Sequence, residues 1–153
     1  MRRITLDAPA RDIIGGMGEI REKVRLTNMA DWLASKAAKR GKRKVRSIEV
    51  EGVIDTGAVM SVVPVHVAQK LGIGIRTQRM AKYADGRTES VGVTDPVLFE
   101  IMGRDTVEEA LILGDEVLIG QTVLEKLDLL ADCAGRRLAP HPDRPNQPVA
   151  VVR

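Results

Sequence analysis

The feature that most limits the folds open to this sequence is the aliphatic, β-branched character of its middle. Val, Ile and Leu crowd the segment from Ile48 to Leu138, whereas Trp32, Tyr83 and Phe99 are the only aromatic residues among 153. β-branched residues favour strands, and glycine and proline divide this segment into short runs. Many short strands with few helices predict a fold of the all-β class, mostly strands with a few short helices. We expect a barrel or sandwich around an aliphatic core.

The chain has the length of one domain, and three segments are expected along it. Residues 1–16 show no periodicity and end in Gly15-Gly16, so we interpret them as a loose leader. Residues 17–140 are the expected domain. The remainder, 141–153, is rich in proline and is expected to be an irregular tail.

Local patterns predict the elements of this domain. Alternating polarity indicates strands, a glycine between two extended runs indicates a hairpin, and a cap or proline start with a glycine stop indicates a helix. Strands are expected at 19–26, 47–54 and 116–119, hairpins at 79–92, 97–113 and 129–139, and helices at 28–39, 65–71 and 122–127. The expected turns are Asp85-Gly86, Gly103-Arg104-Asp105 and Ala134-Gly135, and the expected helix boundaries are Asn28 or Asp31 and Gly41 for the first helix and Pro64 and Gly72 for the second.

The net charge of +3 conceals an asymmetry along the chain. The first 46 residues hold 13 Lys and Arg against 5 Asp and Glu, whereas the remainder holds 11 against 16. The basic run from Lys36 to Arg46 leaves open a nucleic-acid-associated protein, although such runs are more often solvated loops. The scarcity of aromatic residues argues against stacking on single strands, so nucleic acid is not the expected partner.

One cysteine and two histidines without recurrent spacing give no metal-site signature. Cys133 has no partner for an internal disulfide and is expected to be a small buried side chain. No run approaches the roughly 18–20 apolar residues of a membrane span. Asp7 and Arg11 also interrupt any signal-like apolar region near the N-terminus. We therefore expect an untargeted cytoplasmic protein that does not insert into membranes.

The segment Val53-Ile54-Asp55-Thr56-Gly57-Ala58 places an acid directly after an apolar run. A carboxylate at the end of an apolar strand is held rigidly at the edge of the core. Thr56 offers a hydroxyl to fix the neighbouring loop, and Gly57 lets another backbone approach closely. Asp55 is therefore the candidate catalytic residue, with Thr56, Gly57 and Ala58 as its support.

This segment resembles the catalytic loop of the retropepsin-like aspartic peptidases, and is most similar to their small bacterial and archaeal single-lobed members. Two later elements extend the resemblance over roughly residues 19–140. Tyr83 to Glu89 resemble the flap of that family, with Asp85-Gly86 at its tip, and Leu118-Ile119-Gly120 resembles its apolar-apolar-Gly element before a short helix. Retroviral members carry an arginine where this chain has Gln121, and the basic segment at about 28–46 is an insertion relative to the family.

The resemblance implies an acid-protease barrel with one or two short helices and one lobe per chain. It also implies an aspartic endopeptidase that acts on polypeptides without a metal or organic cofactor. Tyr83, Asp85 and Gly86 are then candidate flap or substrate-binding residues, although Tyr83 could instead pack at the base of the flap.

An aspartic peptidase needs two carboxylates that share one proton, yet the chain has one Asp-Thr-Gly triplet. The most similar dipeptide, Asp105-Thr106, is followed by Val107 and not by glycine. The second carboxylate must therefore come from another copy across a two-fold axis, which implies a homodimer.

Two alternatives to this catalytic mechanism stay open. The first is a dimeric peptide- or protein-binding module of the same fold without turnover. The second is a basic nucleic-acid-associated protein in which Lys36 to Arg46 is the working surface. A Ser61–His66–Asp55 triad can also be written, but it is disfavoured because Ser61 lacks a Gly-x-Ser-x-Gly context. His66 is expected to be structural.

Overall fold

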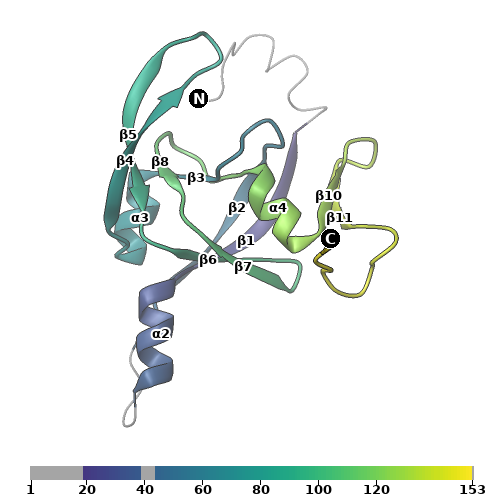
Figure 1. Cartoon of the computed structure of the whole chain (residues 1–153), viewed down its shortest axis with the longest axis horizontal. Helices are drawn as coiled ribbons and strands as arrows, with labels where there is room; N and C mark the ends of the chain where they lie inside the picture. Colours follow the sequence, from purple (N-terminus) through teal and green to yellow (C-terminus); the bar gives the residue numbers. More distant parts are fainter. Residues whose placement is uncertain (1–18, 39–43, 153) are drawn as a thin grey trace.

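The structure, a computed structural model, describes residues 19–38 and 44–152. The expected leader at 1–16 and the expected helix stop at Gly41 lie outside the described residues. A nine-stranded sheet curls around one core, two of the three short helices pack against it while the third projects away, and a two-stranded sheet lies to one side (Figure 1). The mostly-β class is confirmed, with three described helices in place of one or two. No helix in these ranges is long and apolar enough to span a membrane.

The elements follow the order expected from the sequence. The strands are β1 (Ile20–Asn28), β2 (Ser47–Ile54), β3 (Val62–Val63), β4 (Ile75–Lys82), β5 (Thr88–Thr94), β6 (Val97–Ile101), β7 (Arg104–Glu108), β8 (Leu111–Ile112), β9 (Leu118–Ile119), β10 (Leu129–Asp132) and β11 (Arg137–Pro140). The helices are α2 (Met29–Ala37), α3 (Val65–Leu71) and α4 (Gln121–Leu127).

The large sheet has the strand order β4-β5-β8-β3-β9-β2-β1-β6-β7. β1 and β2 form a long antiparallel ladder from Ile20↔Ile54 to Thr27↔Ser47. On its other side β2 pairs in parallel with β9, and β9 pairs antiparallel with β3. Strand β2 therefore lies near the centre of the sheet. Because β9 lies between β2 and β3, the loop that joins β2 to β3 crosses over β9.

The core is aliphatic, as the sequence predicts. Phe99 is the one aromatic side chain in the core of the described chain, where it packs among buried Leu, Ile and Val residues such as Leu26 and Ile119. Trp32 and Tyr83 are only partly buried. Burial of each large aliphatic side chain contributes about 1.5–3 kcal/mol, so this core stabilises the strands that carry the loop after β2.

The basic insertion begins as α2, which projects away from the sheet (Figure 1). Asn28 is its cap, because the Asn28 Oδ1 accepts a hydrogen bond from the Asp31 N–H at 3.0 Å. The Asn28 amide also donates to the Leu71 carbonyl at 2.8 Å, and Arg46 pairs with Asp31 at 2.7 Å. No residue of α2 is buried. The helix is therefore anchored at its base and exposed along its length.

Three local predictions are wrong. The hairpin expected at 97–113 ends at Glu108, because Leu111–Ile112 form a separate strand, β8, that pairs with β3 and β5. The turn between β6 and β7 is Met102-Gly103, with positive φ at both residues, so Arg104 and Asp105 belong to β7. A two-residue turn of this kind matches the twist of the flanking strands, and it directs Arg104 into the interior. Cys133 is exposed, because it lies in the turn between β10 and β11 and not on either strand.

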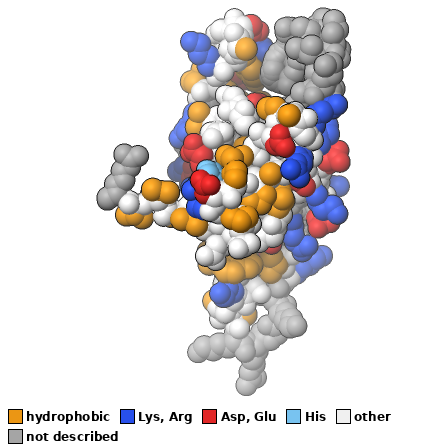
Figure 2. Space-filling view, turned by 90° about the vertical axis from the view of Figure 1, so that its right-hand side faces the viewer, with side chains coloured by type: hydrophobic (Ala, Val, Ile, Leu, Met, Phe, Trp, Pro, Cys, Tyr) orange, Lys and Arg blue, Asp and Glu red, His pale blue; other side chains and the backbone are white. Residues whose placement is uncertain are grey.

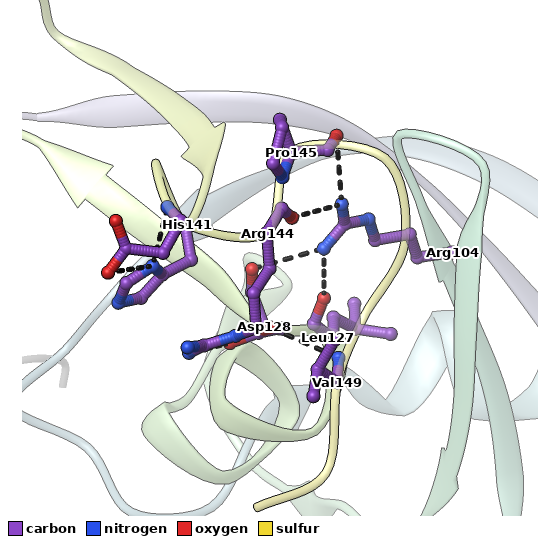
Figure 3. Close-up of polar contacts among 8 residues, drawn as sticks. Arg104, Leu127, Asp128, His141, Arg144, Pro145 and Val149 are labelled. Carbon is purple, nitrogen blue, oxygen red and sulfur yellow. Dashed lines mark hydrogen bonds and ion pairs between the residues drawn. The ribbon is translucent and has the colours of Figure 1, made fainter.

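The tail at 141–152 contains no helix or strand in its described residues, yet it is bound to the end of α4 (Figure 3). Asp128, the C-cap of α4, accepts hydrogen bonds from Arg144 at 2.6 and 2.9 Å and from the Val149 N–H at 3.1 Å. These bonds, that of Arg144 above all, lower the pKa of Asp128 from 3.8 to about 2.

Buried Arg104 completes this junction from the opposite side (Figure 3). Its guanidinium donates to the carbonyls of Leu127 and Asp128 at 2.8 and 3.1 Å, and to those of Arg144 and Pro145 at 3.4 and 3.3 Å. The tail is therefore irregular but fixed. Apolar side chains gather on this side of the molecule, with acidic and basic ones around them (Figure 2).

Candidate active site

Asp55 follows the last residue of β2 and is fixed from two sides. Its backbone N–H donates to the Ile119 carbonyl at 2.9 Å, which extends the parallel pairing of β2 with β9 by one residue. Its carboxylate Oδ1 accepts from the Gly57 N–H at 3.1 Å. Among the described residues no second carboxyl group is hydrogen-bonded to Asp55. The described part of the chain therefore positions one acid and gives it no acidic partner.

The three residues after Asp55 form a tight turn. The Ala58 N–H donates to the Asp55 carbonyl at 3.2 Å, while Thr56 and Gly57 are exposed and Asp55 itself is half-buried. A backbone donor on a carboxylate oxygen fixes the rotamer of the acid without removing it from solvent. Asp55, Thr56, Gly57 and Ala58 are thus brought together in one rigid, accessible loop.

Helix α4 holds the second half of this loop. The Gln121 N–H donates to the Ala58 carbonyl at 2.7 Å, and the Thr122 N–H and Oγ1 both lie within hydrogen-bonding distance of the Val59 carbonyl, at 3.2 and 3.0 Å. The first N–H groups of a helix have no partner inside it, so the loop carbonyls satisfy donors that would otherwise need a cap. The arginine position of retroviral members is therefore occupied by a residue, Gln121, that contacts the loop through its backbone.

Ser61 is a structural residue of this junction. Its side chain is fully buried, and its Oγ accepts a hydrogen bond from the Gly120 N–H at 2.9 Å. His66 is exposed on α3. The Ser61–His66–Asp55 triad is therefore excluded as a nucleophilic site, because the hydroxyl is closed to solvent.

Two further residues of the site were missed by sequence reasoning. Besides the Val59 carbonyl, the Thr122 Oγ1 contacts the Glu108 carboxylate at 2.7 Å, and Glu108 in turn pairs with Lys126 at 3.0 Å. The Glu108 side chain is only 11% exposed. No local pattern marks these residues, since Thr122 lies 63 positions from Val59 along the chain.

The flap candidates lie on the β4–β5 hairpin, which projects beyond the sheet (Figure 1). The Gly86 N–H donates to the Tyr83 carbonyl at 2.9 Å with φ of 90° at Gly86, and the Asp85 carboxylate accepts from the Arg87 N–H at 2.9 Å. This last bond lowers the pKa of Asp85. The Tyr83 hydroxyl bonds to Glu89, and the Arg87 guanidinium lies 4.4 Å from the Tyr83 ring centre. The predicted turn is confirmed, and these contacts stay within the hairpin.

The hairpin and the loop that follows Asp55 meet below the tip of the hairpin. The Arg79 Nη1 on β4 lies 3.2 Å from the Met60 Sδ, five residues after Asp55. The sequence neighbours of these two residues, Val59 and Met80, have largely exposed apolar side chains, at 69% and 61%. An open groove starts at the contact and runs along α4, lined by Met60, Arg79, Glu108, Glu109, Thr122, Glu125 and Lys126.

No protein-family model and no curated protein matches this chain. Several solved structures match this chain. The EIAV protease bound to an inhibitor is 22% identical, with a TM-score of 0.44 over 50% of this chain and 75% of that one. The simian foamy virus (mac) protease is 15% identical, with a TM-score of 0.43 over 68% and 90%. A foamy viral protease-reverse transcriptase bound to an RNA/DNA hybrid is 18% identical, with a TM-score of 0.44 over 69% of this chain and 11% of its own length. These overlaps are partial, so what the site does must follow from the geometry of this chain.

Proposed function

We propose that this chain is one half of a homodimeric aspartic endopeptidase of the retropepsin-like, single-lobed type, with Asp55 of each copy as the catalytic residue. The observation that carries the proposal is the setting of Asp55. It stands at the end of a central strand, tied to Ile119 and Gly57, half-buried and open to solvent. An acid so fixed, and without an acidic partner among the described residues, suits a site that a two-fold axis completes.

The chemistry requires the two Asp55 carboxyl groups to share one proton, since like charges so close cannot both ionise. The ionised group takes a proton from the attacking water, whose oxygen bonds to the carbonyl carbon of the scissile peptide. The protonated group donates its proton to the carbonyl oxygen. The tetrahedral intermediate then breaks its C–N bond as one carboxyl group gives its proton to the leaving nitrogen and the other carboxylate takes a proton from a hydroxyl of the intermediate, which restores the shared proton. No metal or organic cofactor is needed.

The neighbours of Asp55 have supporting roles in this proposal. The Gly57 N–H holds one oxygen of the carboxylate, and the exposed Thr56 hydroxyl is available to the partner copy. Ala58 connects the loop to α4 through its carbonyl. The hairpin bearing Tyr83, Asp85 and Gly86 would cover an extended polypeptide, which pairs with strand edges by backbone hydrogen bonds.

The deciding experiment compares the wild type with Asp55→Asn on a randomised peptide library. The amide keeps the shape of the carboxylate and can accept from Gly57, so folding and dimerisation should be unchanged while cleavage is lost. Binding of a peptide with equal affinity by both proteins, without cleavage by either, would instead support a binding module. Equal cleavage by both would refute the role of Asp55.

A further inference from the structure

Arg79 lies on the side of the flap hairpin that meets the catalytic loop. Strand β4 is exposed along almost its whole length, so most of its side chains extend into solvent. The Arg79 Nη1, however, reaches the Met60 Sδ at 3.2 Å. Since Met60 is five residues from Asp55, the guanidinium lies above one end of the loop that carries the catalytic acid.

The charge of Arg79 is not compensated in the described part of the chain. A thioether sulfur is a weak, uncharged acceptor, and Arg79 has no carboxylate within ion-pair distance among the described residues. The other cations around the groove differ in this respect, because Lys126 pairs with Glu108 at 3.0 Å and Arg76 with Glu109 at 2.5 Å. Arg79 is thus the groove cation left without an anion.

The groove also contains one acid without a cationic partner. Within residues 19–38 and 44–152, Glu125 on α4 accepts only from the neutral Gln121 amide, at 3.2 Å. The groove as a whole is therefore not strongly basic, and its summed field does not select a charge. Selection must come from a short-range contact, and a guanidinium provides one by donating two parallel N–H groups to a carboxylate.

We propose that Arg79 is a specificity-determining residue that pairs with an Asp or Glu side chain of the bound polypeptide, a few residues from the scissile bond. This inference rests on the proposed endopeptidase function and names its substrate class, polypeptides with an acidic residue beside the cut. The groove is lined by Met60, five residues after Asp55, and not by Asp55 itself, so we assign the acidic residue to a flanking position. Lys126 and Arg76 are already paired with Glu108 and Glu109. Arg79 is therefore the cation at the groove that is available to recognise the substrate.

The test is cleavage of a randomised peptide library, with the residues around each cut identified by mass spectrometry. The wild type should favour Asp and Glu over Asn and Gln at one flanking position by about threefold to tenfold, as expected for a partly exposed charge-assisted pair. The preference should shrink as ionic strength rises. Arg79→Glu should reverse it, favouring Lys and Arg at the same position.

Lys82→Glu is the matched control. It makes the same change of charge on the same strand, three residues away in an unbroken register with β5, so its side chain points to the other face of the hairpin. It should keep the acidic preference. If Arg79→Glu unfolds, Arg79→Gln serves in its place and should abolish the preference without reversing it.

The outcomes separate this inference from the proposed function. Cleavage by the wild type without an acidic preference overturns the role of Arg79 and leaves the peptidase intact. An equal shift in Lys82→Glu and Arg79→Glu overturns it too, because the effect would then belong to the general field of the hairpin. Absence of any cleavage by the wild type dimer overturns the peptidase itself and the inference with it.

Discussion

Gly120 lies directly against the backbone of Met60. A Cβ at residue 120 would stand 2.6 Å from the Met60 carbonyl carbon and 2.7 Å from its oxygen, closer than Cβ atoms approach a backbone. The start of α4 and the catalytic loop can touch only because residue 120 has no side chain. The same residue donates its N–H to Ser61. The Ile-Gly element is therefore required by packing against the loop that follows Asp55.

Gly120→Ala should destabilise the fold by about 1–3 kcal/mol, the usual cost of overpacking. It should also abolish most of the peptidase activity, because the rigid backbone of Met60 must move. Urea unfolding and the cleavage rate measure the two effects. Gly57→Ala is the control for stability, since its Cβ would meet only the Asp55 Oδ1, at 3.4 Å. Wild-type stability in Gly120→Ala would contradict the packing argument.

Thr122→Val should lower kcat while costing about 1 kcal/mol of stability. The isosteric change removes a hydroxyl bound to the Val59 carbonyl and Glu108 and leaves a nearly buried carboxylate with one partner fewer. Thr106→Val is the matched control, because Thr106 is a half-buried strand threonine whose side chain makes no hydrogen bond in the described structure. An equal fall in kcat in both variants would show that α4 does not position the loop.

Asp128→Asn should reduce stability at neutral pH and have little effect near pH 2. The pKa of Asp128 is lowered from 3.8 to about 2 by Arg144, so the ionised form stabilises the fold above pH 3.8. That contribution is lost as pH falls through about 2. Thermal unfolding from pH 2 to pH 7 should therefore show curves that converge at low pH. Asp143→Asn, on a side chain 84% exposed, should parallel the wild type throughout.

Activity per chain should fall on dilution and recover with second-order kinetics, because the proposed site needs Asp55 from each of two chains. Excess Asp55→Asn chain should also inhibit the wild type by forming mixed dimers. Sedimentation and cleavage rates over one concentration series provide the measurement. A monomer with full activity would require a second acid in the same chain.

Local signals were sufficient for the elements around the site. The apolar run that ends at Asp55 predicted β2, and Pro64 and Gly72 predicted both ends of α3, where Gly72 adopts a φ of 64°. The β6–β7 turn was not predicted, because a positive φ at Met102 depends on the pairing of the two strands and not on the methionine.

Contacts between distant segments gave no signal of their own. The sequence around Ser61 gives no sign that its hydroxyl accepts a hydrogen bond from Gly120, 59 residues away. Ser61 therefore appeared as a possible nucleophile. The fixed position of the tail was not predicted for the same reason. Its proline-rich composition predicts an irregular backbone but not the hydrogen bonds of Arg144 with Asp128.

The two ends of α4 contact different parts of the molecule. Its first residues hold the carbonyls of the catalytic loop, and its C-cap, Asp128, holds Arg144 and Val149 of the tail. A helix of seven residues is about 10 Å long. The tail and the loop after Asp55 therefore contact opposite ends of one short helix. An affinity tag or a truncation at the C-terminus is consequently not a neutral change for this protein. A chain shortened before Arg144 would lose these contacts with α4, and a test of the proposed peptidase activity on it would give too low a rate.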